Sequence, residues 1–249
     1  MSEIAIHIEN LSYSYKGQLG NTLSDINLKI EAGSTIGLFG PNGAGKTTLM
    51  HLMTGVLKNN NGTITLFGSK VGAKHKETKN LFGFVPQDFS FYQELSPVEN
   101  LQFFGAFYGL SKQKIAQRTE ELLTVFGLTE VSKKPVAKFS GGMKRKVNLA
   151  IGIIHQPKII FLDEPTVGVD VQSRCAIIDY IKKLNKQGAT LVYTSHQLNE
   201  AEEICEKIAL INEGEIIAFE DISTLLAKHN EKNLENLFLK LSKETVSYV

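Results

Sequence analysis

One stretch constrains the fold of this chain more than any other, and it has the sequence Gly40-Pro41-Asn42-Gly43-Ala44-Gly45-Lys46-Thr47-Thr48. It matches G-x-x-x-x-G-K-[ST], in which the glycines let consecutive backbone N–H groups turn inward around a phosphate. Residues 34–39 before it have the pattern of a short buried strand, and residues 46–53 that of a helix. We therefore predict a strand–loop–helix unit that binds phosphates, in which Lys46 reaches the outer phosphates and Thr47 holds Mg²⁺. A glycine-rich turn without a ligand is the alternative.

The composition limits the class of protein. The chain has 249 residues, with 27 Lys plus Arg against 26 Asp plus Glu. This length suits one large domain with its own core, and the balanced charge lacks the positive field of nucleic-acid-binding proteins, so we expect no nucleic-acid partner. The two cysteines do not have the C-x-x-C spacing of a metal or redox site. Because there is no run of 18 apolar residues and no leader-like N-terminus, we expect the chain neither to cross a membrane nor to be secreted by that route.

Two carboxylates follow a second apolar segment. Residues 159–162 are continuously apolar, as in a strand buried on both faces, and Asp163 and Glu164 come directly after them. Ligands bind at the carboxyl end of such strands, where Asp163 can hold Mg²⁺ and Glu164 can take a proton from water. Residues 189–196 also have a strand pattern, so His196 is expected beside the carboxylates if the two strands are neighbours. Two solvated carboxylates at the end of a strand are the alternative.

Periodicity and turn signals predict most of the other elements. Alternating apolar residues over 4–30 predict two or three antiparallel strands. Ser96-Pro97-Val98-Glu99 combines a capping box with a proline at the first helical position, so a helix is expected to begin at Pro97. The further expected elements are strands at 63–68 and 82–87, helices at 97–108, 112–126 and 171–186, a hairpin at 209–217 and an amphipathic helix in the tail.

An aromatic region follows Gln87. Pro86 ends the preceding strand, which places Gln87 at the edge of the sheet. The aromatic residues of this region are Phe89, Phe91, Tyr92, Phe103, Phe104, Phe107 and Tyr108. They form the core of a small helical sub-domain or, where exposed, a docking surface for a partner, since exposed apolar patches mark interaction sites.

A helix start at Ser140 has the features of an anion site. Ser140 is suited to cap the helix, and Gly141 and Gly142 leave its first turn open. Lys144 and Arg145 are expected to strengthen this site. Many helices begin with Ser-Gly and bind nothing, so the motif gains weight only beside the others.

In this order, the motifs resemble those of the nucleotide-binding subunits of ABC transporters across nearly the whole chain. The resemblance assigns Gly40 to Thr48 to the Walker A motif, Gln87 to the Q-loop, Phe139-Ser140-Gly141-Gly142-Met143 to the signature motif, Ile159 to Asp163 to Walker B, Glu164 to the catalytic glutamate, residues 167–170 to the D-loop and His196 to the switch histidine. Tyr15 is the best match for the aromatic residue that stacks on adenine, and Tyr13 is the alternative register.

The resemblance implies the cofactors and the fold. ATP and Mg²⁺ are the implied cofactors, with Thr47, Gln87 and Asp163 around the metal and with Lys46, Gln87, Glu164 and His196 in catalysis. The implied fold is α/β, a RecA-like P-loop NTPase core with a mixed, mostly parallel sheet, an N-terminal antiparallel β sub-domain and an inserted α-helical sub-domain. Within a single domain over 1–249, the core and its β sub-domain take 1–88 and 155–225, the helical sub-domain takes 89–154 and a helical tail takes 226–249.

The resemblance also implies partners. In this family two subunits pair head to tail, and each ATP lies between the P-loop of one subunit and the signature motif of the other. We therefore expect a homodimer and a separately encoded membrane permease that docks near Gln87 and the aromatic region 89–110. The implied location is cytoplasmic, peripheral on the inner face of the cell membrane.

Two departures from the family pattern indicate a branch. Phe139 and Met143 replace the usual leucine and glutamine of the signature, as in drug and antibiotic exporters, and the ending 234–241 is similar to that of daunorubicin-type resistance ATPases. Export by ATP hydrolysis is therefore the expected function. The alternatives are an importer subunit and a soluble ABC ATPase of assembly, translation or repair. A kinase on a P-loop fold would leave the motif from Ser140 to Met143 unexplained.

Overall fold

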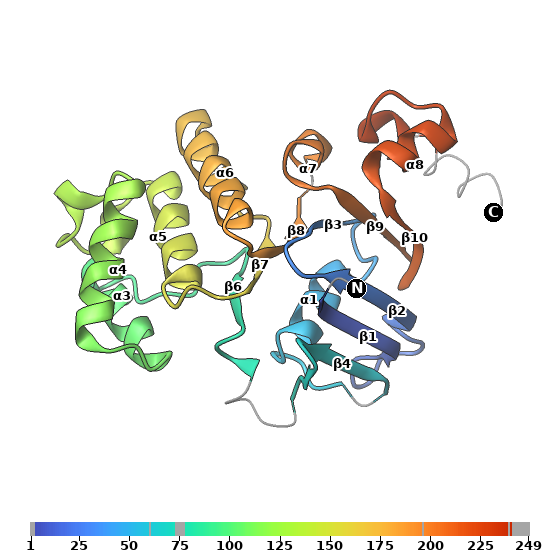
Figure 1. Cartoon of the computed structure of the whole chain (residues 1–249), viewed down its shortest axis with the longest axis horizontal. Coiled ribbons are helices and arrows are strands. Elements are labelled where there is room, and N and C mark those ends of the chain that lie inside the picture. The colour runs from blue at the N-terminus through green and yellow to red at the C-terminus, as the bar shows by residue number, and fades with distance from the viewer. Residues whose placement is uncertain (1–2, 60, 73–77, 196, 239, 241–249) are drawn as a thin grey trace.

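Two β-sheets and the helices around them make up the structure. The computed structural model describes residues 3–59, 61–72, 78–195, 197–238 and 240. One sheet has the strand order β10-β9-β3-β8-β7-β6, and the other has the order β2-β1-β4-β5. Figure 1 shows the small sheet at one end of the molecule and a group of helices at the other.

The larger, central sheet is mixed and mostly parallel, as expected. Its strands are β3 (Thr35–Phe39), β6 (Phe82–Val85), β7 (Ile159–Asp163), β8 (Thr190–Thr194), β9 (Lys207–Asn212) and β10 (Glu215–Asp221). The pairs from β6 through β7, β8 and β3 to β9 are parallel, and only β10 pairs antiparallel, in the predicted hairpin with β9. Every residue of β3, β7 and β8 is buried, which is why the middle of each strand is apolar and polar residues stand only at the strand ends.

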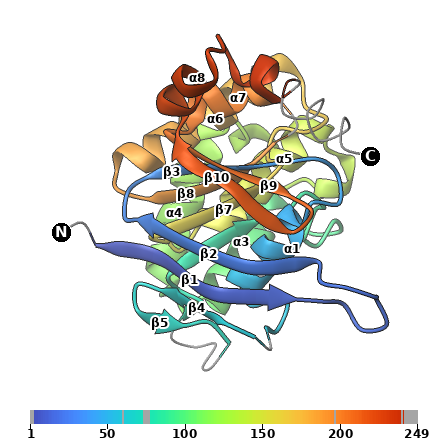
Figure 2. The ribbon, with the colours of Figure 1, turned by 90° about the vertical axis from the view of Figure 1, so that its right-hand side faces the viewer.

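The smaller sheet is antiparallel throughout. Its strands are β1 (Ile4–Tyr13), β2 (Leu23–Glu31), β4 (Thr63–Leu66) and β5 (Ser69–Lys70). Residues of β2 alternate between buried and exposed, because one face of this sheet packs on the core and the other faces solvent. One hydrophobic cluster joins this sheet to α1 (Lys46–Met53) and to β7. Figure 2 shows the small sheet beside the central one, with α1 near both.

Three helices group beyond β6. They are α3 (Pro97–Phe107), α4 (Lys112–Val125) and α5 (Gly141–Ile153), with the 3₁₀ turns η1 (Thr129–Val131) and η2 (Val136–Lys138) between α4 and α5. The predicted capping box is present, since Ser96 and Glu99 bond each other's backbone N–H groups. All three helices lie within the expected helical sub-domain at 89–154, although the boundaries of the proposed sub-domains remain predictions.

Three more of the described helices lie in the C-terminal part of the chain. They are α6 (Val171–Lys186), α7 (Leu198–Ile204) and α8 (Ile222–His229). The bounds of α6 agree with the sequence prediction, whereas no bounds were predicted for α7, because its seven residues are too few to establish a period. In the tail, residues 234–238 are helical, and Leu234 and Leu237 are buried against the body.

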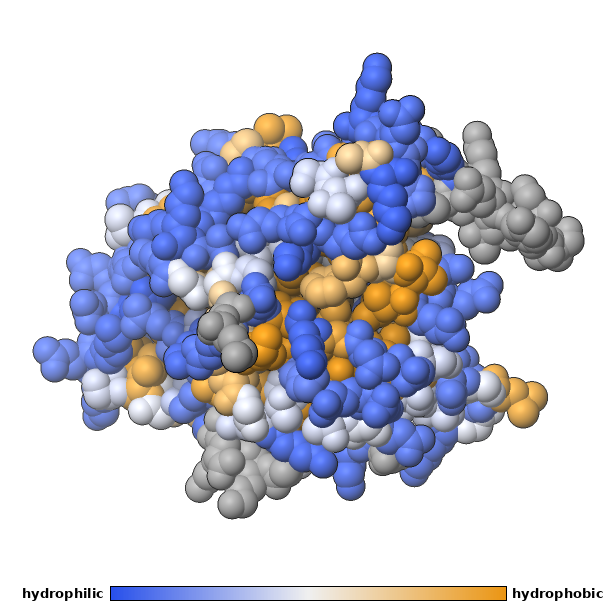
Figure 3. Space-filling view, turned by 45° about the vertical axis from the view of Figure 1, so that its right-hand side comes forward, coloured by the Kyte–Doolittle hydropathy of each residue, from blue (hydrophilic) through white to orange (hydrophobic). Residues whose placement is uncertain are grey.

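The aromatic region 89–110 contains both core and surface. Phe91, Phe104 and Tyr108 pack against the main hydrophobic cluster, whereas Tyr92, Phe103 and Phe107 are 47%, 46% and 59% exposed. Among the described residues, no helix is long and apolar enough to span a membrane. The face in Figure 3 is mostly hydrophilic, with an apolar area near its middle.

Candidate functional site

The loop from Gly40 to Gly45 connects β3 to the start of α1, as predicted. Two of its glycines are required by geometry. Gly45 has a φ of 105°, and a Cβ atom there would lie 2.6 Å from Leu23 Cδ2; at Gly40 it would lie 1.9 Å from the main-chain oxygen of Ile211. Gly45 caps α1 without a side-chain hydrogen bond, so no side chain of the cap occupies the open amides of the first turn.

A hollow of about 450 Å³ lies over this loop. Its lining residues are Tyr15, Gln18, Thr22, Asn42, Gly43, Gly45, Lys46, Thr47, Thr48, Gln87 and Glu164. The loop is thus brought together with Gln87 from the end of β6 and Glu164 from the end of β7. We call this hollow the P-loop pocket.

Lys46 lines the P-loop pocket. Its Nζ donates hydrogen bonds to the main-chain oxygens of Gly40, at 2.7 Å, and Pro41, at 2.9 Å. Burial lowers the pKa of Lys46, while the carboxylates of Glu164 and Asp163 act in the opposite direction. A phosphate bound at the loop would offer the Lys46 ammonium a negatively charged acceptor in place of these neutral carbonyl oxygens.

The two carboxylates lie at the carboxyl end of β7, beside β8. Asp163 and Glu164 are only 4% and 9% exposed. Thr194 of β8 donates its hydroxyl to Asp163 Oδ1 at 2.6 Å, and the N–H of Glu164 donates to Thr194 Oγ1 and to Thr194 O, both at 3.1 Å. Glu164 has a φ of 48°, a left-handed conformation that is unfavourable for this residue type and that these bonds hold in place.

The strands that precede Glu164 and position 196 are neighbours, since β7 pairs with β8 in parallel, so the condition set for His196 is met. His196, expected beside the carboxylates, lies outside the described residues. The residues on either side of it are linked, because Gln197 N donates to Ser195 Oγ at 2.9 Å. Sequence reasoning missed Thr194, because only the strand register shows that its hydroxyl faces Asp163.

Gln87 is held by α5. Arg145, which is buried, donates from Nη1 to the main-chain oxygens of Gln87 and Pro86, and Asn148 Nδ2 donates to Pro86 O at 3.0 Å. Burial lowers the pKa of Arg145, and the nearby carboxylates, Glu164 first among them, oppose this. We expected Arg145 to strengthen an anion site at Ser140. Instead, it lies more than one turn further along α5, where its side chain faces the end of β6.

The residues from Ser140 to Gly142 lie outside the P-loop pocket. Ser140 caps α5 by accepting a hydrogen bond from Met143 N, as predicted, and it is exposed. A Cβ atom on Gly142 would lie 2.5 Å from Ser173 Oγ and 2.7 Å from Asp170 Oδ2, so this glycine packs directly on the start of α6. None of the three lines the pocket of its own chain.

Tyr15 lines the P-loop pocket and Tyr13 does not. The Tyr15 hydroxyl is 3.1 Å from Thr48 Oγ1, and its ring is 40% exposed. Tyr13 contacts the Tyr15 ring edge-on, with the centroids 5.1 Å apart, and packs against the hydrophobic cluster of the small sheet. An exposed ring at the mouth of the pocket is the arrangement that stacking on a base requires.

The comparisons agree with this site. The family described as ABC transporter matches residues 23–167. The chain is 39% identical over 213 residues to the linearmycin resistance ATP-binding protein LnrL of Bacillus subtilis (strain 168), which covers 86% of this chain and 68% of LnrL. It is 32% identical over 249 residues to the Nod factor export ATP-binding protein I of Rhizobium sp. (strain N33), covering 100% of this chain and 81% of that protein.

Two further matches are informative. The doxorubicin resistance ATP-binding protein DrrA of Mycobacterium tuberculosis (strain CDC 1551 / Oshkosh) is 36% identical over 217 residues, or 87% of this chain and 65% of DrrA. A solved structure, described as the dimeric structure of a post-hydrolysis state of the ATP-binding cassette MJ0796 bound to ADP and Pi, has a TM-score of 0.79 and 26% identity, covering 87% of this chain and 98% of that chain.

The fold and the P-loop pocket define a nucleotide-binding P-loop ATPase. The chain belongs to the ABC transporter family, as an ATP-binding subunit that hydrolyses ATP.

Proposed function

We propose that this ATPase drives an exporter and that two copies work as a head-to-tail pair. The pair would move a separately encoded membrane permease as it closes on ATP and reopens. The observation that carries the pairing is the position of the signature residues. Ser140 is exposed and lies outside the P-loop pocket, as do Gly141 and Gly142. This position leaves the amides at the start of α5 and the Ser140 hydroxyl available to bind the phosphates held in the P-loop pocket of a second copy.

The site residues predicted from the sequence have proposed roles in ATP binding and hydrolysis. Glu164 is the base that takes a proton from the attacking water, and His196 and Gln87 position that water and the terminal phosphate. Lys46 stabilises charge on the outer phosphates, the amides from Gly40 to Thr48 surround them, and Tyr15 stacks on adenine.

The oxygen donors near the loop fit Mg²⁺. Thr47 offers a hydroxyl, Gln87 an amide oxygen and Asp163 a carboxylate, and Mg²⁺ prefers such hard ligands together with phosphates. Thr47 and Gln87 line one pocket, and Asp163 precedes its Glu164. When bound, the metal neutralises charge on the phosphates. The Thr194 hydroxyl donates to Asp163 Oδ1 and so fixes the orientation of this carboxylate, which leaves Oδ2 for the metal.

Export is supported by the relatives, which include drug resistance and Nod factor export ATP-binding proteins. The exposed rings of Tyr92, Phe103 and Phe107 support permease docking in the aromatic region. This region follows Gln87 in the chain, so a permease docked there would move with the P-loop pocket. Docking would keep the subunit peripheral on the inner face of the membrane.

Mixing two inactive variants tests the head-to-tail pair. Lys46→Ala removes the cation of the P-loop, and Ser140→Arg blocks the open start of α5. Neither variant should turn over alone, but a mixed pair has one site with both defects and one with none. Random pairing would then restore about a quarter of wild-type turnover. Complete inactivity of the mixture, with both variants folded, would contradict the pairing.

Co-purification tests the exporter. The intact chain, tagged and expressed in its native host, should co-purify with a multi-helix membrane protein. Phe107→Ser, which removes an exposed ring, should reduce that recovery and leave ATP turnover of the isolated chain unchanged. Recovery only with ribosomes, nucleic acid or a soluble scaffold would contradict the transport role.

A further inference from the structure

A fully buried carboxylate lies outside the P-loop pocket. Glu200 belongs to α7, and none of its surface is exposed. A charged side chain in such a position is stable only when it is paired and hydrogen-bonded. The residue roles proposed above make no use of Glu200, although it lies only a few residues after His196 in the chain.

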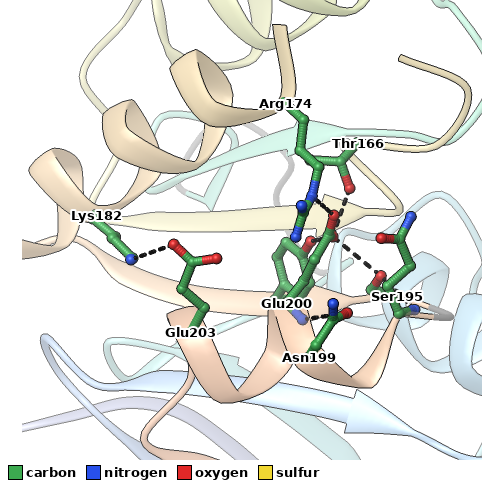
Figure 4. A network of polar contacts seen from close by, with 9 residues as sticks. Thr166, Arg174, Lys182, Ser195, Asn199, Glu200 and Glu203 are labelled. Carbon is green, nitrogen blue, oxygen red and sulfur yellow. Dashed lines mark hydrogen bonds and ion pairs between the residues drawn. The ribbon is translucent and has the colours of Figure 1, made fainter. Parts of the chain in front are cut away.

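Four side chains from three segments donate to this carboxylate (Figure 4). Glu200 Oε2 accepts from Thr166 Oγ1 at 2.6 Å, from the Tyr193 hydroxyl at 2.5 Å and from Ser195 Oγ at 3.3 Å. Glu200 Oε1 accepts from Arg174 Nε at 2.5 Å. Burial raises the pKa of Glu200, but the bonds from Thr166, Tyr193 and Arg174 outweigh burial and hold the pKa below its ordinary value.

Two of these donors are next to proposed catalytic residues. Thr166 lies two residues after Glu164, whose left-handed φ makes its orientation dependent on the surrounding bonds. Ser195 directly precedes position 196, and its Oγ also accepts from Gln197 N. The Ser195 hydroxyl therefore connects the backbone on the far side of position 196 to the Glu200 carboxylate.

The third segment leads towards the signature glycines. Arg174 is in α6, whose N-cap residue Asp170 accepts from Ser173 N at 2.8 Å. Gly142 of α5 packs against these same two side chains. Glu200 thus bonds the segments that follow β7 and β8 and also the helix on which the start of α5 rests.

We propose that Glu200 is a positioning residue for ATP hydrolysis, whose buried carboxylate fixes the segment that carries Glu164 relative to the segment that carries His196. This proposal rests on the roles given to those two residues under the proposed function. Glu200 does not touch the P-loop pocket, so its loss acts on turnover and leaves nucleotide binding intact. The carboxylate suits this task because both of its oxygens accept and neither donates.

Glutamine at position 200 would keep the shape but not the bonding. Its single oxygen would remain on Arg174, since a guanidinium cannot accept a hydrogen bond. Its NH₂ group would then face the hydroxyls of Thr166 and Tyr193, which would have to reverse from donors to acceptors. The three segments that donate to position 200 would be held less firmly, and no large cavity would form.

The test compares Glu200→Gln with Glu203→Gln in the full chain, by steady-state ATP turnover with excess Mg²⁺ and by affinity for a fluorescent ATP analogue. Glu203 is the matched control, because its ion pair with Lys182, at 2.8 Å, joins the same two helices, α6 and α7, on the solvent side. We expect kcat of Glu200→Gln to fall about 10- to 100-fold, with KM and analogue affinity changed by less than about threefold. Glu203→Gln should behave as wild type.

A kcat for folded Glu200→Gln equal to that of Glu203→Gln would overturn the proposal, and so would a loss confined to KM. Thr166→Val is a second variant. It replaces one hydroxyl by a methyl group of similar volume and leaves the Glu200–Arg174 pair intact. It should lower kcat as well, and it decides the question if Glu200→Gln does not fold. Combined with Glu200→Gln it should add little, because both changes break the same bond.

Glu164→Gln separates this proposal from the function on which it rests. Wild-type turnover in Glu164→Gln would remove the assignment of the base, and the proposal for Glu200 would fall with it. If Glu164→Gln is inactive while Glu200→Gln and Thr166→Val turn over normally, only the role of Glu200 is wrong.

Discussion

Arg145 Nη1 donates a hydrogen bond to the main-chain oxygen of Gln87 at 2.7 Å, which ties a buried cation of α5 to a residue of the P-loop pocket. The same nitrogen reaches Pro86 O at 3.3 Å, and the guanidinium carbon lies 4.7 Å from the centroid of the Phe89 ring. A displacement of α5, which begins at Gly141, would therefore move the Gln87 backbone with it.

Arg145→Lys should lower ATP turnover although it keeps the charge. An ammonium cannot reproduce the planar fork that contacts both carbonyl groups and the Phe89 ring, so Gln87 is held less firmly. We expect kcat to fall about tenfold or more, as when a reacting group is misplaced by a fraction of an ångström. Arg118→Lys is the control, because Arg118 bonds the main-chain oxygens of Ile153 and Ile154 at the opposite end of α5. It should reduce the free energy of unfolding but leave kcat unchanged. Equal kcat values for the two variants would contradict this prediction.

Thr194→Val should weaken the apparent affinity for Mg²⁺ in ATP turnover. The substitution removes the hydroxyl that donates to Asp163 Oδ1 and that accepts from Glu164 N, so the carboxylate loses its fixed orientation. The Mg²⁺ concentration for half-maximal turnover should rise about 10- to 100-fold. Thr194→Ser keeps the hydroxyl and should stay close to wild type in the same titration. A rise of the same size in Thr194→Ser, which keeps the hydroxyl, would contradict the role given to this hydrogen bond.

Gly45→Ala should destabilise the fold more than Gly43→Ala. Both glycines have positive φ, at 105° and 82°, so both substitutions should cost about 1–2 kcal/mol of backbone strain. Only at Gly45 does the new Cβ also collide, at 2.6 Å from Leu23 Cδ2, whereas nothing lies within 4 Å at Gly43. Urea unfolding of the two variants measures the difference. Similar losses would mean that Leu23 moves aside freely.

Much of the fold follows from local signals in the sequence. The capping box at Ser96 places the start of α3, and continuous apolar runs mark β3 and β7, because a strand covered on both faces has no polar side. The bounds of α7 could not be predicted, since a helix of seven residues gives no clear period. Glu200 of this helix is fully buried, but nothing in the local sequence distinguishes it from a surface glutamate.

The site divides in the same way. The residues proposed to bind phosphates can be predicted from the sequence, because the loop geometry restricts them to glycine, lysine and threonine at fixed spacing. The residues that hold those groups in place, such as Thr194, Arg145 and Glu200, have no such spacing. Their partners are brought to them by strand pairing and helix packing, and several lie more than 25 residues away in the chain.

His155 should make the fold sensitive to acid. Its ring is stacked on Tyr108, with centroids 3.6 Å apart, and its Nε2 bonds Phe82 O at 2.9 Å. Burial lowers the pKa of His155 to about 4, with Arg118 acting in the same direction and the bond to Phe82 opposing it. The unfolded chain, with an ordinary pKa of 6.5, binds the proton first as pH falls, so stability is complete above 6.5 and is lost between pH 6.5 and about 4. The loss from this residue is roughly 3 kcal/mol.

His155→Phe should remove this contribution. Phenylalanine keeps the stack on Tyr108 but gives up the hydrogen bond to Phe82 O, so at pH 7 the variant should be less stable by about 1 kcal/mol. Its free energy of unfolding should fall less steeply between pH 6.5 and 4, because no proton binds at this position. Urea unfolding at pH 7, 5.5 and 4.5 should therefore show the difference between wild type and variant shrinking and then reversing sign. A difference that stays constant over this range would mean that His155 does not titrate differently in the folded and unfolded chains.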